Sequence, residues 1–65
     1  MQPSIKPGDV VKFENGRDVH TGTVFEPYTD PLRPDMEETW TVLVPGQRQP
    51  FRVRARRMER VLGSV

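Results

Sequence analysis

The chain has 65 residues and no cysteine, and its ten Lys or Arg and nine Asp or Glu give a net charge of +1 at pH 7. This length allows one domain at most, and the lack of cysteine excludes disulfides and thiolate metal sites. No apolar run approaches the roughly 20 residues of a membrane-spanning helix, and residues 1–7 lack the apolar stretch of a signal peptide. We therefore expect a soluble cytoplasmic protein that makes no membrane contact.

The first predicted strand covers residues 9–13, directly after a Pro-Gly turn signal. Val11 and Phe13 are two residues apart, so they share one face of this strand. The Asn15-Gly16 pair that follows tolerates the positive φ of a tight turn, and it predicts the first reversal of the chain.

The second predicted strand covers residues 20–25 and is rich in β-forming residues. Gly22 in its interior predicts a bulge or a close approach of another backbone. Residues 27–38 then form a long irregular loop, because three prolines interrupt strand pairing there and four residues are acidic. We expect this loop to be the least ordered internal segment, with few backbone hydrogen bonds to the rest of the domain.

The third predicted strand, residues 39–44, is the clearest in the sequence. Trp40, Val42 and Val44 share a face, and the Thr and Leu residues between them take the other face. We expect Trp40 to be mostly buried, because it lies on the apolar face.

In the fourth predicted strand three apolar residues alternate with three arginines: Phe51, Arg52, Val53, Arg54, Ala55 and Arg56. Period two is the strand period, so one face enters a core and the other carries a row of guanidinium groups. A short 3₁₀ turn is predicted at residues 56–58 and a closing strand at residues 59–62. Residues 1–4 and 63–65 are predicted to be frayed ends.

Five short strands with frequent turn signals, and no helix longer than one turn, predict an all-β domain over residues 5–62. We expect a small five-stranded barrel. The predicted core has ten members: Val11, Phe13, Val24, Trp40, Val42, Val44, Phe51, Val53, Met58 and Val61.

The order of these signals resembles the SH3-like barrel superfold. The Gly8-Asp9 pair is similar to the opening of the first strand in KOW- and Tudor-type members of that superfold. Residues 22–24, Gly-Thr-Val, resemble the Gly-x-Val of their second strand, and residues 56–61 resemble the 3₁₀ turn and last strand that close the barrel. The resemblance implies a five-stranded SH3-like barrel with a short 3₁₀ turn before the last strand.

Two kinds of protein with this fold are similar in size. The polymerase-interaction domain of CarD-type transcription factors has a similar strand order and docks through its last two strands, which correspond to residues 40–61 here. Plasmid-type dihydrofolate reductases end in a Leu-Glu-Arg-Ile sequence that residues 58–61 resemble. Their folate-site Val-Gln-Ile-Tyr falls at residues 51–54, where Arg replaces both Gln and Tyr, so the reductase activity is not implied.

The sequence offers little for catalysis or metal binding. The two serines, Ser4 and Ser64, lie in terminal segments, and His20 is the sole histidine, so Ser-His and Cys-His arrangements are excluded by residue count. No spacing resembles an EF-hand loop or a zinc ligand set. We expect no enzyme, no cofactor and no metal site, with His20 facing solvent at a strand end.

The charge is divided unevenly along the chain, and this division marks the candidate site. Residues 1–46 carry a net charge of −4, whereas residues 47–65 hold six Arg and one Glu, a net charge of +5. The candidate binding residues are these six arginines: Arg48, Arg52, Arg54, Arg56, Arg57 and Arg60. The arginine row is suited to an anionic partner, either nucleic acid or an acidic protein patch in the transcription or translation apparatus.

Two other interpretations of the arginine row stay open. The row is a solvated strand face paired with Glu37, Glu38 or Glu59, or it is neutralised by the acidic loop or by a second copy of the chain. In the latter case the protein is a protein–protein adaptor or a self-assembling structural subunit that uses a sheet edge. A role in binding requires that Arg52, Arg54 and Arg56 point outward, form one patch and remain unpaired by the loop.

Overall fold

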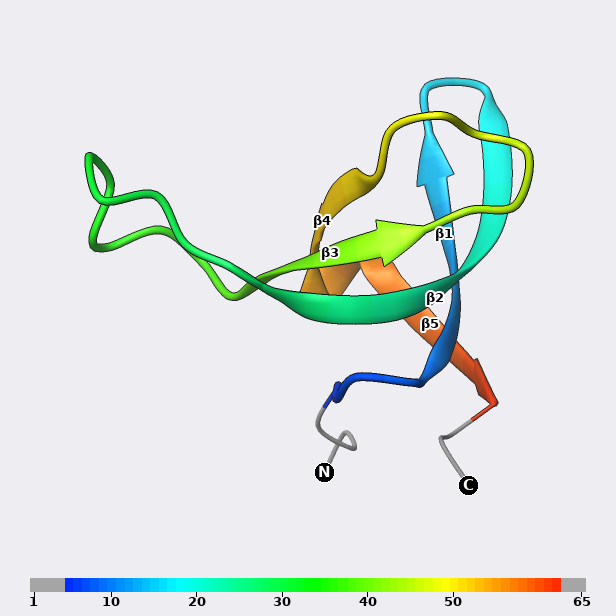
Figure 1. Cartoon of the computed structure of the whole chain (residues 1–65), viewed down its shortest axis with the longest axis horizontal. Coiled ribbons are helices and arrows are strands. Elements are labelled where there is room, and N and C mark those ends of the chain that lie inside the picture. Colours follow the sequence, from blue (N-terminus) through cyan, green and yellow to red (C-terminus); the bar gives the residue numbers. More distant parts are fainter. Residues whose placement is uncertain (1–4, 63–65) are drawn as a thin grey trace.

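The computed structural model describes residues 5–62 and shows an all-β chain (Figure 1). Within that range five antiparallel strands form one sheet in the order β4-β3-β2-β1-β5. The strands are β1 (Val10–Asn15), β2 (Asp18–Tyr28), β3 (Thr39–Leu43), β4 (Phe51–Arg54) and β5 (Met58–Leu62), and a 3₁₀ helix, η1 (Ala55–Arg57), joins β4 to β5. The predicted all-β class, the five strands and the short 3₁₀ turn are confirmed. Because β4 and β5 do not pair in the described chain, the sheet is not closed. No helix among residues 5–62 is long and apolar enough to cross a membrane.

The β1–β2 hairpin confirms the first predicted reversal. Asn15 pairs with Asp18, so the turn consists of the two residues between them. Gly16 has a φ of 65°, a value that suits the first position of a two-residue hairpin turn. This tight turn places β1 and β2 in a register that runs from Asn15 opposite Asp18 to Val10 opposite Thr23.

Strand β2 is longer than predicted, because it pairs with β1 along its first half and with β3 along its second half. The register with β3 shifts between Val24 and Glu26, so the strand has a bulge at Phe25 and bends there. The predicted close approach at Gly22 is confirmed. A Cβ atom at this position would lie 2.6 Å from the backbone oxygen of Leu43, so only glycine fits without a shift of β3.

The core lies inside this bent sheet. Its buried centre consists of Val11, Phe13, Val24, Val42 and Val53. Five partly buried side chains pack around that centre: Ile5, Trp40, Val44, Phe51 and Met58. Nine of the ten predicted core residues are therefore in the core, and Ile5 was not predicted.

The prediction that Val61 belongs to the core is wrong, since its side chain is 57% exposed. In the β1–β5 register Phe13 is opposite Met58 and Val11 is opposite Arg60. Side chains that face each other across an antiparallel pair lie on the same side of the sheet, so Met58 and Arg60 turn toward the core side. Val61 therefore points outward with Glu59.

Asp9 is a fully buried carboxylate that joins three segments of the chain. Its Oδ2 accepts a hydrogen bond from the backbone N–H of Lys6 at 3.0 Å and lies 3.6 Å from Nε of Arg60 in β5. Its backbone oxygen accepts a hydrogen bond from the N–H of Val24 at 2.8 Å. A buried charge is tolerated only when it is paired and hydrogen-bonded, and these contacts meet that condition.

Strand β3 lies between β2 and β4 and is more buried than its alternation predicts. Trp40 is half-buried against the core, and its indole N–H donates a hydrogen bond of 2.8 Å to Oε2 of Glu38. Thr39 and Thr41 were expected on the open face, yet each is only 7% exposed. Thr41 is opposite Glu26 of β2 and Arg52 of β4, and Thr39 is opposite Tyr28 and Arg54.

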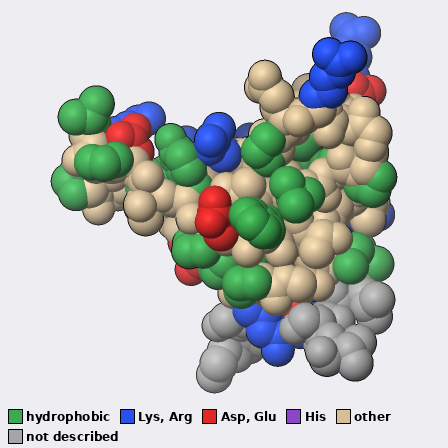
Figure 2. Space-filling model, in the orientation of Figure 1, with side chains coloured by type: hydrophobic (Ala, Val, Ile, Leu, Met, Phe, Trp, Pro, Cys, Tyr) green, Lys and Arg blue, Asp and Glu red, His purple; other side chains and the backbone are tan. Residues whose placement is uncertain are grey.

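The segment between β2 and β3 projects from the sheet as an arm, which we define as residues 29–38 (Figure 1). The pairing of Tyr28 with Thr39 shortens the predicted loop to this range. Its backbone hydrogen bonds are mostly local turns, such as Arg33 N–H to the oxygen of Asp30 at 2.9 Å. Leu32 is 89% exposed, and apolar side chains gather at the far end of the arm in Figure 2.

Candidate functional site

Three of the candidate arginines gather where β4 passes into η1. Arg52 and Arg54 lie exposed on β4, where they alternate with half-buried Phe51 and buried Val53. The period-two pattern of the sequence therefore describes this strand correctly. β4 ends at Arg54, so Arg56 projects from η1 rather than from the strand. We call Arg52, Arg54 and Arg56 together the basic face.

Arg52 reaches across β3 to an aromatic ring on β2. Its guanidinium carbon lies 4.5 Å from the ring centroid of Tyr28. Because β3 separates β4 from β2, this contact spans β3, where Thr41 is opposite Arg52 and Thr39 is opposite Tyr28. Such a cation–π contact is worth about 0.5–1 kcal/mol at an exposed site.

Arg54 and Arg56 share one carboxylate from the arm. Oε2 of Glu37 lies 3.6 Å from Nε of Arg54 and 3.1 Å from Nε of Arg56. The condition that a binding face stays unpaired by the acidic loop is therefore not met by these two residues, and an anionic partner reaches them only by displacing Glu37. All three side chains are more than half exposed, and exposed ion pairs of this kind contribute only about 0.2–1 kcal/mol each.

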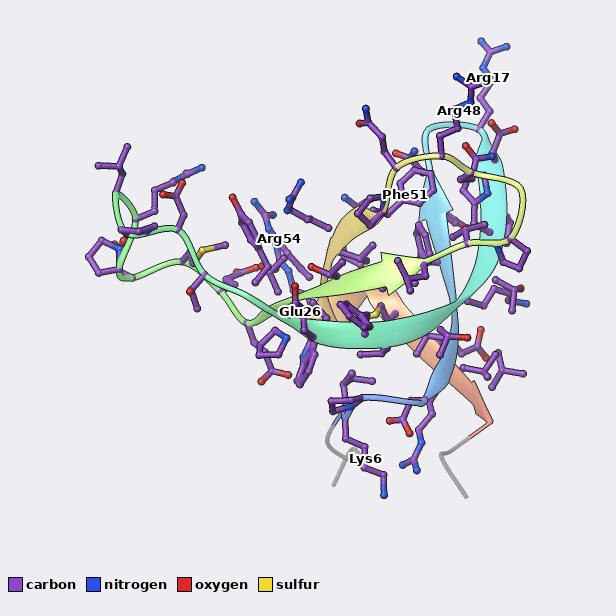
Figure 3. The ribbon with its side chains drawn as sticks, viewed as in Figure 1. Lys6, Arg17, Glu26, Arg48, Phe51 and Arg54 are labelled. Carbon is purple, nitrogen blue, oxygen red and sulfur yellow. The ribbon has the colours of Figure 1, made fainter. Side chains whose placement is uncertain are left out.

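The base of the arm is fixed beside η1, and this explains why Glu37 reaches the arginines. The backbone N–H of Ala55 donates a hydrogen bond of 2.9 Å to the backbone oxygen of Glu38. The hydroxyl of Thr39 donates a bond of the same length to the backbone oxygen of Glu37. These two bonds hold the backbone carbonyl groups of Glu37 and Glu38 in place. Figure 3 shows Arg54 on the side of the sheet from which the arm projects.

The other two predicted carboxylate partners lie elsewhere. Glu38 accepts the indole hydrogen bond of Trp40. Glu59 lies 4.0 Å from Nζ of Lys12, between β5 and β1. Among residues 5–62, Glu37 is thus the only carboxylate in an ion pair with the basic face. Three guanidinium groups with one counterion leave the face positively charged.

Of the remaining three candidate arginines, Arg48 and Arg60 are separated from the basic face and Arg57 lies beside it. Arg48 lies between β3 and β4, at the end of the molecule where Arg17 lies and away from Arg54 (Figure 3). Arg60 turns to Asp9 and is 29% exposed, which indicates a structural role. Arg57 in η1 lines a hollow of about 270 Å³ together with Arg52 and Arg54, and a second, open hollow of about 450 Å³ together with Lys12. The structure therefore brings together four of the six arginines, three of which form the basic face.

A hollow of about 270 Å³ lies between the arm and β4, beside the basic face. Its lining includes Arg54, Glu37, Thr39 and Met36. The sequence predicted the arginines but not Thr39, which the β3–β4 register places opposite Arg54, nor Met36, whose position depends on the path of the arm. It also missed Tyr28 as the partner of Arg52, although both fall on the same face once the β2–β3 and β3–β4 registers are known.

The basic face offers N–H donors and positive charge, which suit binding rather than chemistry at a bond. His20 is half-buried and stacks on Phe51 at 5.0 Å between ring centroids, with the Phe13 centroid at 5.7 Å. This differs from the solvent-facing position that we expected for His20. In the described part of the chain no three or more His, Cys, Asp or Glu gather to hold a metal ion.

Comparisons with models of protein families, with curated proteins and with solved structures find no match to this chain. Its function is therefore inferred from the geometry and charge of the basic face.

Proposed function

We propose that this chain is a small non-catalytic binding module whose basic face contacts an acidic protein surface. The observation that carries the proposal is the convergence of Arg52, Arg54 and Arg56 at one end of the sheet, with Glu37 as their counterion among the described residues. A guanidinium group is planar, stays charged and presents donors that match a carboxylate. Three such groups side by side favour a partner with several carboxylates.

An acidic protein surface is favoured over nucleic acid for two reasons. Proteins that bind single strands use exposed aromatic rings on which the bases stack, and the Tyr28 ring beside this face is already covered by Arg52. In addition, the group that already lies between Arg54 and Arg56 is a carboxylate. The contacts of Glu37 with Arg54 and Arg56 support a partner that offers carboxylates, and the Arg52 guanidinium over the Tyr28 ring makes base stacking there less favourable.

The proposal extends to the fold and its setting. The order β4-β3-β2-β1-β5, a bent β2 that serves both halves of the sheet, and a 3₁₀ helix before the last strand all support an SH3-like barrel. We place the module in the cytoplasm, where an acidic patch on a protein of the transcription or translation apparatus would be a suitable partner.

The experiment that tests this function is a binding titration with a fluorescent polyglutamate peptide. Arg52→Gln, Arg54→Gln and Arg56→Gln are combined in one variant, and Lys6→Gln, Lys12→Gln and Arg17→Gln are combined in a control with the same net charge. We expect the first variant to lose binding at least about tenfold and to stay folded, because exposed charges contribute little to stability. The control should keep most of the affinity.

Equal losses in the two variants would mean that the peptide senses only net charge, and they would contradict a specific basic face. A parallel titration with oligothymidylate distinguishes the partner classes. If the oligonucleotide binds the wild-type protein more tightly than the peptide does, with an affinity that falls steeply as salt rises, the nucleic-acid interpretation replaces the one proposed.

The adaptor interpretation is supported by a different observation. β5 is an edge of the sheet, and Val61 on it is 57% exposed. Unpaired edges are sites for strand addition between chains. If the protein self-assembles through this edge, sedimentation should show a dimer that persists in high salt and dissociates in a Val61→Lys variant. A monomer under all conditions would remove this second candidate.

A further inference from the structure

A single oxygen atom marks a specific position within the basic face. Oε2 of Glu37 is the atom that contacts both Nε of Arg54 and Nε of Arg56, at 3.6 Å and 3.1 Å. The two arginines come from different elements, β4 and η1, so the change from strand to 3₁₀ helix brings their guanidinium groups to one point. Two cations around one oxygen form a site for a single anionic group.

We propose that Arg54 and Arg56 form a subsite for one carboxylate of the acidic partner, and that Glu37 occupies this subsite in the free protein. The inference rests on the proposed function of the basic face. Because one oxygen of Glu37 contacts both arginines, a partner carboxylate takes the same position only after Glu37 leaves. Glu37 therefore competes with the partner and lowers its apparent affinity.

The contacts of Glu37 allow this exchange. Its backbone oxygen accepts the Thr39 hydroxyl, and the next residue accepts the N–H of Ala55, so the backbone at the base of the arm is fixed. In the described chain its side-chain carboxylate is held by the two arginines alone, and this side chain is 51% exposed. A rotation of the side chain is thus enough to vacate the subsite, without movement of the arm as a whole.

Arg52 has a different part in binding. Its guanidinium lies on Tyr28 and forms no ion pair among the described residues. It is therefore open to a partner carboxylate before Glu37 moves. We infer an order in which Arg52 makes the first contact and the Arg54–Arg56 subsite is filled by exchange.

The test compares Glu37→Gln with a matched control, Asp35→Asn. Both changes remove one negative charge from the arm and keep the size of the side chain, but Asp35 is exposed and forms no ion pair in the described structure. With the polyglutamate peptide at low ionic strength, Glu37→Gln should bind about two- to fivefold more tightly than Asp35→Asn, the fold-change that corresponds to one or two exposed ion pairs. A Glu37→Gln affinity equal to that of Asp35→Asn would overturn the proposal.

A second measurement separates this inference from the function on which it rests. Heteronuclear NMR reports the side-chain Nε–H resonances of Arg54 and Arg56 directly. In the wild-type protein the peptide should shift the Nε–H resonances of Arg54 and Arg56. It should also move the backbone resonances of residues 36–38 toward the positions that they have in the free Glu37→Gln variant. One outcome is that the triple Arg→Gln variant loses binding while, in the wild-type protein, the resonances of residues 36–38 do not respond to the peptide. The basic face then binds the peptide, but Glu37 does not compete with it. If that triple variant binds as the wild type does, the proposed function fails and this inference fails with it.

Discussion

At the scale of single residues, arginines that look equivalent in the sequence have different roles because their partners differ in burial. Arg60 pairs with Asp9, which is fully buried. Arg54 and Arg56 pair with Glu37, which is half exposed. A pair that includes a buried charge costs much to break, since the remaining charge is left without water, whereas an exposed pair is exchanged easily.

This difference predicts a strong effect of Asp9→Ala on stability. The change removes the acceptor for the Lys6 N–H and the partner of Arg60, so the free energy of unfolding should fall by about 1–3 kcal/mol. Urea unfolding followed by Trp40 fluorescence measures the loss. The control is Asp18→Ala, an exposed position in β2, which should change stability by less than about 0.5 kcal/mol. Equal effects at the two positions would show that Asp9 does not hold these segments together.

At the scale of elements, short sequence patterns predicted the features that depend only on residues within one strand. The alternation from Phe51 to Arg54 predicted which side chains of β4 face outward, and Gly22 predicted the close approach of β3. The exposure of Val61 was missed because Met58 was assigned to the 3₁₀ turn rather than to the last strand. Once β5 begins at Met58, Met58 and Arg60 face the core side and the alternation turns Val61 outward.

The arm shows the same limit for the candidate site. Composition predicted an acidic, irregular segment, but not which of its carboxylates would reach an arginine. That choice depends on the hydrogen bond from Ala55 to Glu38, a contact between residues far apart in the chain. Glu37 and Glu38 are neighbours of the same type, yet one faces Arg54 and Arg56 and the other faces Trp40.

Hydrogen exchange should distinguish the arm from the strand that follows it. The bonds given by Arg33 and Met36 within the arm are local, whereas β3 is paired on both sides, with β2 and with β4. We expect backbone amides of residues 31–37 to exchange at least about tenfold faster than those of Thr39–Leu43, because local turns open without disrupting the sheet. Exchange in the arm as slow as in β3 would show that the arm is an integral part of the fold.

At the scale of the whole molecule, the uneven charge of the sequence is partly cancelled by the fold. The acidic first part of the chain supplies the arm, and the arm brings Glu37 to the basic last part. Among the described residues only Glu37 forms ion pairs with the three arginines of the basic face, so the face keeps a positive charge. Electrostatic attraction at such a face raises association rates and fixes the orientation of a partner.

The central claim is that this face, and no other surface of the described chain, contacts an acidic protein partner. Backbone and arginine side-chain NMR during a titration with the polyglutamate peptide tests it most directly, because each residue reports its own surroundings. The account predicts the largest shifts at Arg52, Arg54, Arg56 and Glu37, with small shifts at Lys12. Shifts of equal size across the surface, or shifts centred on Lys12 and the outer side of β1 and β5, would contradict it.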